Sequence, residues 1–175
     1  MTISIRSANE EDAGLLSRLG GGLFSQTFAH LYDPVDLSFF LNTSHSEQKI
    51  CDDMSDGASY GIAFFHQKPI GYIKFGKNGL PVVLGVGRHF EIKQLYIERA
   101  YHRQKIGQRL MDFAFSQMAL NPSDVIFVGV WTENFLAQKF YARLGFDPFA
   151  CYWYPVGRKI DRELIMVKSL NLSFV

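Results

Sequence analysis

The sequence has few cysteines and no long apolar run. Only Cys51 and Cys151 occur among 175 residues, and they form no CxxC motif. This argues against a disulfide framework, so reduced structural cysteines are expected, and no metal ligand is predicted. No apolar segment approaches the roughly 20 residues that a membrane-spanning helix needs. The first residues, MTISIRSANEEDAG, lack the apolar core of a signal peptide, so we expect a cytoplasmic protein without a membrane partner.

The chain also lacks an excess of charge of either sign. Its formal net charge of +1 argues against a general nucleic-acid or membrane surface, so any anion site must be local. Hydrophobic residues make up 47% of the chain and aromatic residues 15%, which is enough for a real core and excludes disorder. With no repeat or linker visible, a single domain over residues 1–175 is expected.

Strand and helix patterns alternate along the chain, which predicts an α/β fold with a mixed sheet. Asn9 and the Asp33-Pro34 pair are typical helix starts. Strands are predicted over 2–7, 90–97, 124–130, 149–156 and 160–168, a hairpin over 59–76 with its turn at Gln67-Lys68-Pro69, a loop over 77–88, and helices over 46–55, 103–119 and 133–144, the last capped by Thr132 and ended by Gly145.

Two glycine-containing stretches invite comparison with phosphate-binding loops. Gly20-Gly21-Gly22 has no strand directly before it and no Lys-Ser/Thr after it, so a break or bend in a helix is expected instead. The stretch YHRQKIGQRL, residues 101–110, joins a strand pattern to a helix pattern and crowds basic side chains around Gly107. A helix N-terminus with a glycine suits a phosphorylated ligand. A solvated basic helix start with an incidental glycine is the alternative.

The segment FEIKQLYIERAYHRQKIGQRLM resembles the central motif of the GCN5-related N-acetyltransferases (GNAT). In that family a strand ends in an L-Y-V-like triplet, and Q/R-x-x-G-x-G/A leads into a helix that holds the acetyl-CoA pyrophosphate. Gly107 fits the pattern, whereas His102 and Lys105 depart from it. Lys105 must therefore keep a backbone shape that glycine usually provides or shift the loop. The resemblance implies that acetyl-CoA contacts Leu95, Tyr96, Ile97, Arg103, Gln104, Lys105, Ile106, Gly107 and Gln108.

A second segment, VIFVGVWTENFLAQKFYARLGF, resembles the N-x-x-A-x-x-F/Y-Y-x-x-x-G-F motif of the same family. Asn134 and Tyr141 are about two helical turns apart, so they share a helix face, and Ala137 between them leaves room for a thin ligand. By resemblance, Asn134 binds the pantetheine arm and the Tyr141 hydroxyl lies at the sulfur. A core aromatic before a helix-ending Gly-Phe is the alternative for Tyr141.

The resemblance implies a fold and a reaction. The fold is a mixed, mostly antiparallel sheet flanked by helices, with a V-shaped split between two parallel strands. The reaction moves an acetyl group from acetyl-CoA to a primary amine, without a metal. Tyr141 is predicted as the general acid, because a phenol stays protonated near neutral pH. Backbone N–H groups at the end of the 90–97 strand are expected to polarise the acetyl carbonyl.

Glu91 lies four residues before Leu95, where some members of the family it resembles carry a catalytic glutamate, so Glu91 is predicted as the general base, acting through a water if its face of the strand lines the cleft. Alternation along a strand places it on one face with Lys93, Leu95 and Ile97. The alternative is a strand-end glutamate in solvent.

The acceptor amine is suggested by further similarity. The segments FSQTFAHLYDP, VGVWTEN and RELIMVKSL resemble bacterial acetyltransferases of spermidine and spermine. Recognition of a polyamine calls for carboxylates and aromatic faces, and candidates are Asp33, Asp36, Asp52, Asp53, Asp56, Phe24, Phe28 and Tyr32. Solvated helices and a packed core explain the same residues. The acceptor alternatives are a protein N-terminus, a lysine, an amino acid or an antibiotic amine. A non-catalytic acyl-CoA sensor is a different class of function, and a homodimer is suggested only by analogy with relatives.

Overall fold

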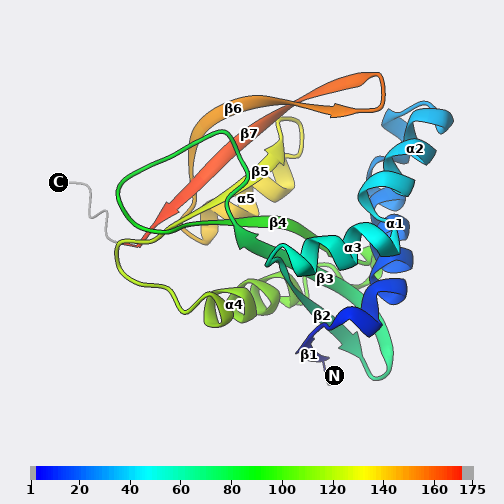
Figure 1. Ribbon diagram of the computed structural model, residues 1–175, viewed down its shortest axis with the longest axis horizontal. Coiled ribbons are helices and arrows are strands. Elements are labelled where there is room, and N and C mark those ends of the chain that lie inside the picture. The colour runs from blue at the N-terminus through cyan, green and yellow to red at the C-terminus, as the bar shows by residue number, and fades with distance from the viewer. Residues whose placement is uncertain (1–2, 171–175) are drawn as a thin grey trace.

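One seven-stranded sheet organises the molecule in the computed structural model, which describes residues 3–170 (Figure 1). The strand order is β1-β2-β3-β4-β5-β7-β6. The strands are β1 (Ile3–Ser7), β2 (Ser59–Phe65), β3 (Lys68–Lys77), β4 (His89–Ile97), β5 (Val125–Trp131), β6 (Asp147–Val156) and β7 (Lys159–Ser169). The α-helices are α1 (Ala13–Phe28), α2 (Pro34–Ser44), α3 (Glu47–Ser55), α4 (Ile106–Met118) and α5 (Phe135–Arg143), and short 3-10 turns are η1 (Glu10–Asp12), η2 (Ala29–Leu31) and η3 (Arg99–Tyr101).

The sheet is split between β4 and β5. These two strands are parallel, whereas every other neighbouring pair in the sheet is antiparallel. Their ladder joins only residues 89–92 to 125–128. Beyond it β4 stays paired with β3 and β5 stays paired with β7. The predicted mixed sheet with a V-shaped split between two parallel strands is therefore confirmed.

A β-bulge marks the point where the split begins. Phe75 of β3 pairs with Ile92 and the next residue back, Lys74, pairs with Gln94, so Lys93 is an extra residue on β4. An extra residue reverses the alternation of side chains along a strand. The prediction that Glu91, Lys93, Leu95 and Ile97 share one face is wrong. Leu95 and Ile97 pack on the same core as Phe90 and Ile92, whereas the Glu91 carboxylate accepts from the Gly79 N–H of the loop that covers the other face.

The two faces of the sheet have separate cores. On one face, α4 and α5 bury Ile106, Leu110 and Tyr141 against strand residues such as Ile92 and Val128. On the other face, α1 and α3 pack over β2 and β3, and the loop 78–88 covers part of β5 and β7. Figure 1 shows α1, α2 and α3 grouped at one end of the sheet, with α4 apart from them. The split between β4 and β5 therefore lies between the helices of the two faces.

The first turns of two helical segments have the capping residues that the sequence predicts, but the three consecutive glycines of α1 do not interrupt the helix. Asn9 caps η1 in a capping box with Asp12, and the Asp33 carboxylate accepts from the Val35 N–H at 2.9 Å, both as predicted. A break or a bend is the expectation for Gly20-Gly21-Gly22, and the break is wrong, because α1 runs through all three glycines. A Cβ at Gly20 would lie 2.9 Å from the His45 ring and from the Tyr72 hydroxyl, so close packing explains that glycine.

Other boundaries shift by a few residues. The helix predicted over 103–119 begins at Ile106, because Arg103 and Lys105 adopt left-handed backbone angles. The side chain of Asn134, not Thr132, caps α5. The hairpin turn lies at residues 66–67, just before the predicted position, and Gly145 follows α5 with a positive φ as expected.

Two further expectations concern single residues and the membrane. Within the described residues, Cys51 is half-buried, Cys151 is exposed, and neither forms a disulfide. No helix in residues 3–170 is both long enough and apolar enough to cross a membrane.

Candidate active site

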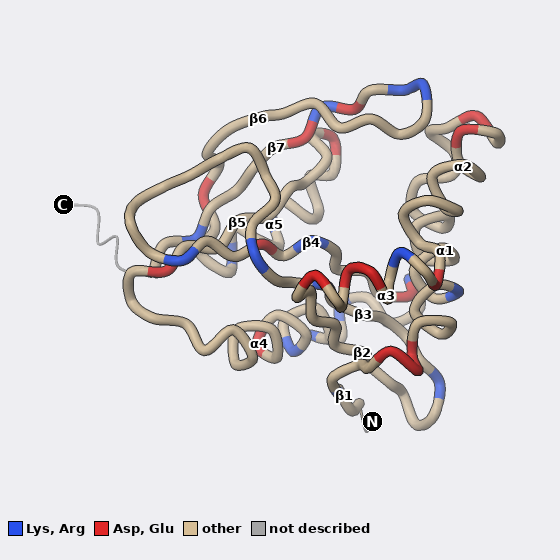
Figure 2. The backbone as a smooth tube through the Cα atoms, viewed as in Figure 1, with Lys and Arg blue, Asp and Glu red and all other residues tan. Residues whose placement is uncertain are grey.

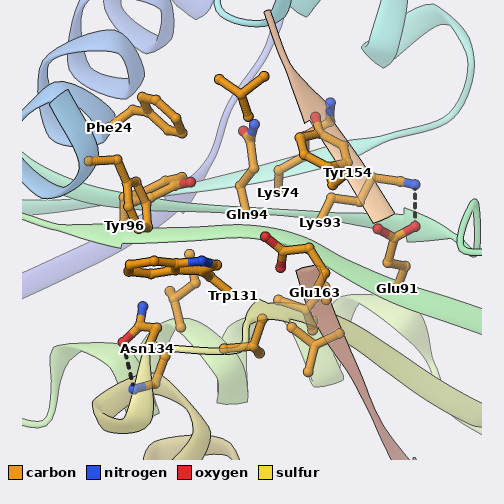
Figure 3. A pocket seen from close by; sticks show the side chains of 18 of the residues that line it. Phe24, Lys74, Glu91, Lys93, Gln94, Tyr96, Trp131, Asn134, Tyr154 and Glu163 are labelled. Carbon is orange, nitrogen blue, oxygen red and sulfur yellow. Dashed lines mark hydrogen bonds and ion pairs between the residues drawn. The ribbon is translucent and has the colours of Figure 1, made fainter. Parts of the chain in front are cut away.

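A pocket of about 300 Å³ occupies the split between β4 and β5 (Figure 3). From the α4–α5 side it is lined by Ile92, Leu95, Val128, Val130, Asn134, Ala137 and Tyr141. From the opposite side it is lined by Phe24, Phe28, Tyr32, Phe40, His45, Tyr96, Trp131, Tyr152, Tyr154 and Glu163. The pocket therefore connects the two faces of the sheet, and we name its two halves the α5 side and the aromatic side.

The α5 side is built from one face of a short helix. Asn134 caps α5 by accepting from the Ala137 N–H at 3.1 Å, and its amide NH₂ donates to no other residue that the structure describes. Ala137 and Tyr141 follow on the same face, and all three residues line the pocket. The predicted grouping of Asn134 and Tyr141 is thus present in the structure.

Tyr141 is buried, with 6% of its surface exposed, and it packs against Phe140 and Phe146. Its hydroxyl has no hydrogen-bond partner within the described residues. Burial raises the pKa of Tyr141 well above that of a free phenol. A phenol of this kind keeps its proton at neutral pH and can donate it to an anion that forms in the pocket.

The strand edge beside the pocket is open. Residues 93–97 of β4 have no ladder partner on β5, and Leu95 and Tyr96 line the pocket. Ile97, the third residue of the predicted triplet, lies outside the lining, and its carbonyl contacts the His102 ring at 2.9 Å. The free edge offers backbone groups to a ligand lying in the split.

The loop before α4 keeps the backbone shape that glycine usually provides. Lys105 has φ +61° and Arg103 has φ +62°, both in the left-handed region. The N–H groups of Ile106, Gly107 and Gln108 have no partner among the described residues, so the helix start presents free donors. None of the six residues from Arg103 to Gln108, which are predicted to contact acetyl-CoA, lines the pocket itself.

Gly107 has a packing role. A Cβ there would lie 3.2 Å from the Phe140 ring of α5 and 3.4 Å from Ile97. Glycine therefore lets α4 approach α5 and β4 closely, which holds the helix start next to the split.

Glu91 lines the pocket but is already engaged. Its Oε2 accepts from the Lys93 ammonium at 2.8 Å and from the Gly79 N–H at 2.8 Å. Glu91 as a residue is 9% exposed, and its carboxylate lies beside Lys93 in Figure 3. Its predicted role as a base stays a prediction.

The five aspartates singled out for the acceptor lie away from the pocket lining. Figure 2 shows acidic residues along α2 and α3. Asp53 binds Lys74 at 2.5 Å and Lys49 at 2.6 Å, and Asp36 pairs with Arg158 at 3.2 Å. The predicted aromatic residues Phe24, Phe28 and Tyr32, by contrast, all line the pocket. The ring centroids of Phe28 and Tyr32 lie 5.1 and 6.1 Å from that of Phe24.

Sequence reasoning missed Glu163, the second carboxylate of the pocket. It projects from β7 between Trp131 and Tyr154 in Figure 3. Burial, and then the nearby charge of Asp161, raises the pKa of Glu163 to about 7. The sequence predicts the strand over 160–168 that contains Glu163 but gives the residue no role. A single polar residue between Arg162 and Leu164 carries no signal of its own for a site.

His45 is a further residue that the sequence did not indicate. It lines the pocket at 4% exposure, between the rings of Phe24 and Phe40. Burial, and then the charge of Lys74, lowers the pKa of His45 to about 4, so the ring is neutral at pH 7. Among the described residues, its Nε2 is a buried nitrogen without a hydrogen-bond partner.

Comparisons with known proteins agree with this geometry. Residues 26–146 match the acetyltransferase (GNAT) family. An uncharacterized N-acetyltransferase in the pepI 3′ region of Lactobacillus delbrueckii subsp. lactis is 23% identical over 172 residues, which covers 96% of this chain and 98% of that protein. A Mycobacterium tuberculosis protein named Uncharacterized N-acetyltransferase Rv2669 is 22% identical over 160 residues, covering 91% of this chain and 98% of that one.

Solved structures share the fold. The PaiA N-acetyltransferase of Thermoplasma acidophilum, crystallised with coenzyme A, superposes with a TM-score of 0.72 at 20% identity and covers 97% of this chain and 99% of that chain. A Corynebacterium glutamicum structure described as histone acetyltransferase HPA2 and related acetyltransferase gives a TM-score of 0.72 at 16% identity over the full length of both chains. The chain therefore belongs to the acetyltransferase (GNAT) family and is an acetyl-CoA-dependent N-acetyltransferase.

Proposed function

We propose that this enzyme acetylates a primary amine of a polyamine such as spermidine, in the cytoplasm. The observation that carries the proposal is a pocket that crosses the sheet at the split. Its α5 side offers hydrogen-bond donors for a thin arm, and its aromatic side offers rings and a carboxylate for a cation. Acetyl-CoA supplies the activated acetyl group.

The α5 side fits the donor. The Asn134 NH₂ group and the open edge of β4 would bind the pantetheine arm, because both carry unpaired polar groups beside the pocket. The free N–H groups at the start of α4 would bind the pyrophosphate, with Arg103 and Lys105 adding positive charge. In this arrangement the left-handed angle of Lys105 replaces a glycine without loss of the loop shape.

Tyr141 would act as the general acid. When the new C–N bond forms and the C–S bond breaks, sulfur leaves as a thiolate that needs a proton. The buried phenol keeps its proton at neutral pH and lies on the helix face that follows Asn134. Backbone N–H groups on the open edge of β4 would polarise the acetyl carbonyl.

The aromatic side supports a cationic acceptor. Eight of its lining residues are Phe, Tyr or Trp, namely Phe24, Phe28, Tyr32, Phe40, Tyr96, Trp131, Tyr152 and Tyr154. Aromatic faces attract ammonium groups. The aspartates of α2 and α3 play no part in this proposal, since they are paired elsewhere or lie outside the lining. A single domain and a homodimer stay predictions from the sequence.

A thiol-release assay tests the function. Free CoA is measured from acetyl-CoA with spermidine, spermine, lysine, simple amino acids or a peptide with a free N-terminus as acceptor. The proposal predicts release with the polyamines in preference to the others. Release with a different amine would contradict the polyamine assignment and keep the chemistry. Acetyl-CoA binding without release for any amine would contradict the transfer reaction and favour the sensor alternative.

A further inference from the structure

The aromatic side of the pocket surrounds one carboxylate with rings. In the sheet register Glu163 lies opposite Trp131 of β5 and opposite Tyr152 of β6. Directly opposite residues on antiparallel strands project to the same face, so these three side chains form a row. Tyr154 and Asp161 form the adjacent row. The carboxylate therefore lies among aromatic neighbours contributed by two other strands, β5 and β6.

The Glu163 carboxylate has no partner of opposite charge among residues 3–170. Figure 3 shows it pointing into the pocket, and no ion pair or hydrogen bond joins it to another described residue. The two lysines of the pocket are held elsewhere, Lys74 by Asp53 at 2.5 Å and Lys93 by Glu91 at 2.8 Å. A half-buried carboxylate without a counter-charge is costly, so a cationic ligand is the partner that its surroundings favour.

Several titratable groups face Glu163. They are Asp161 on the same strand, Tyr152 and Tyr154 on β6, Tyr96, Glu91 and Lys93 on β4, and Tyr32 after η2. Asp161 is itself occupied, since it accepts from the Tyr32 hydroxyl at 2.5 Å and pairs with Lys159 at 3.1 Å. Burial first, and then the charge of Glu163, raises the pKa of both Tyr152 and Tyr154, which places these phenols close to it.

We propose, as an extension of the proposed acetyl transfer, that Glu163 binds the acceptor's ammonium group between Tyr96, Trp131 and Tyr154 and accepts its proton. The ammonium loses one proton to the carboxylate and becomes a nucleophilic amine. As nitrogen bonds to the acetyl carbon and the C–S bond breaks, nitrogen loses a second proton and sulfur receives one from Tyr141. The second nitrogen proton restores the phenol through solvent, and Glu163 releases the first to water, so one proton is released per acetylation.

Glu163 is better placed for this role than Glu91. The Lys93 ammonium and the Gly79 N–H already occupy Oε2 of Glu91. Glu163 is free, and its pKa of about 7 suits proton acceptance near neutral pH. The acceptor class that follows is an amine that is cationic in solution and thin enough to pass between aromatic rings.

The test compares Glu163→Gln, Glu163→Asp, Glu91→Gln and, as a matched surface control, Glu11→Gln, which changes an exposed glutamate. For each variant the turnover number is measured with spermidine across the pH range, and the acetyl-CoA dissociation constant is measured by calorimetry. We expect Glu163→Gln to lower turnover by about 100-fold and to abolish the inflection near pH 7. Glu163→Asp should keep the inflection at a reduced rate, and the acetyl-CoA dissociation constant should stay unchanged in all four.

Two results overturn the proposal in distinguishable ways. If the wild type transfers acetyl groups and Glu163→Gln keeps both the rate and the inflection, the role of Glu163 is wrong and the proposed function stands. If Glu91→Gln, and not Glu163→Gln, loses the inflection in the pH profile of turnover, the base is Glu91. The role of Glu163 is then wrong, and the proposed function stands. If the wild type acetylates no amine while binding acetyl-CoA, the proposed function fails, and the role of Glu163 fails with it.

Discussion

The α5 side and the aromatic side of the pocket differ in how the chain builds them. The α5 side comes from one short stretch, in which Asn134, Ala137 and Tyr141 follow each other on a single helix. The aromatic side draws on α1, α2, β4, β5, β6 and β7 and on Tyr32, which follows η2, and these residues meet only in the folded chain. The comparison suggests that the donor site is a local feature of the sequence, whereas the acceptor site is a property of the tertiary structure.

The largest expected effect is on the α5 side. Tyr141→Phe removes the proposed proton donor and keeps the ring, so turnover should fall by about 100-fold or more. Acetyl-CoA binding, measured by calorimetry, should be unchanged. Tyr101→Phe alters a half-buried tyrosine outside the pocket lining and should leave turnover alone. Equal turnover for Tyr141→Phe and the wild type would remove the acid role.

On the aromatic side, Trp131→Ala should weaken acceptor binding and spare the donor. Loss of a cation–π contact of roughly 1–2 kcal/mol corresponds to an increase of about tenfold in the acceptor KM. The matched control is Trp153→Ala, which changes a tryptophan that is 68% exposed on β6 and lies outside the pocket lining. The same KM for both variants would argue against an aromatic acceptor site.

The free energy of unfolding of Glu163→Gln tests whether the Glu163 carboxylate is unpaired in the ligand-free protein. The pKa of the Glu163 carboxyl is 4.5 in a free side chain and about 7 in the folded protein. As the pH rises through this range, the folded state becomes less stable relative to the unfolded state, because folding disfavours the charged form. Glu163→Gln should therefore stabilise the ligand-free protein by about 1–3 kcal/mol at pH 8 and by little at pH 4. Urea unfolding at the two pH values checks this, with Glu11→Gln as the control. A destabilised Glu163→Gln at pH 8 would mean that a protein group holds the charge.

The smallest expected effect concerns the loop before α4. Lys105→Gly relieves a left-handed residue and should stabilise the protein by up to about 1 kcal/mol. It also removes a charge near the proposed pyrophosphate site, so acetyl-CoA should bind a few-fold more weakly. Lys105→Ala removes the same charge and keeps the strain. Similar unfolding free energies for the two variants would show that the backbone angle costs nothing.

The fold and the α5 side could be predicted from the sequence because their signals are local. Strand periodicity, the Asp33-Pro34 helix start and the spacing of Asn134 and Tyr141 depend on neighbours within one element. The sequence does not distinguish Thr132 from Asn134 as the cap of α5, because both residue types are good caps and only the folded backbone selects Asn134.

The remaining features depend on contacts between distant segments. The alternation in FEIKQLYI gives no sign of the bulge at Lys93, which exists only through pairing with β3. α1 continues through three glycines, and Gly20 packs closely against His45 and Tyr72 from distant parts of the chain. Glu163 acquires its surroundings from Trp131 and Tyr152 on two other strands. No local pattern carries that information.

The central claim is that acetyl-CoA and a cationic amine enter the pocket from opposite sides of the sheet and meet at the split. A crystal structure with CoA and an N-acetylated polyamine bound together tests it most directly. The account predicts the CoA sulfur beside Tyr141, the pantetheine arm along Asn134, and an amine nitrogen within hydrogen-bond distance of Glu163. A product nitrogen bound at Glu91, or a product lying outside the aromatic side, would contradict it.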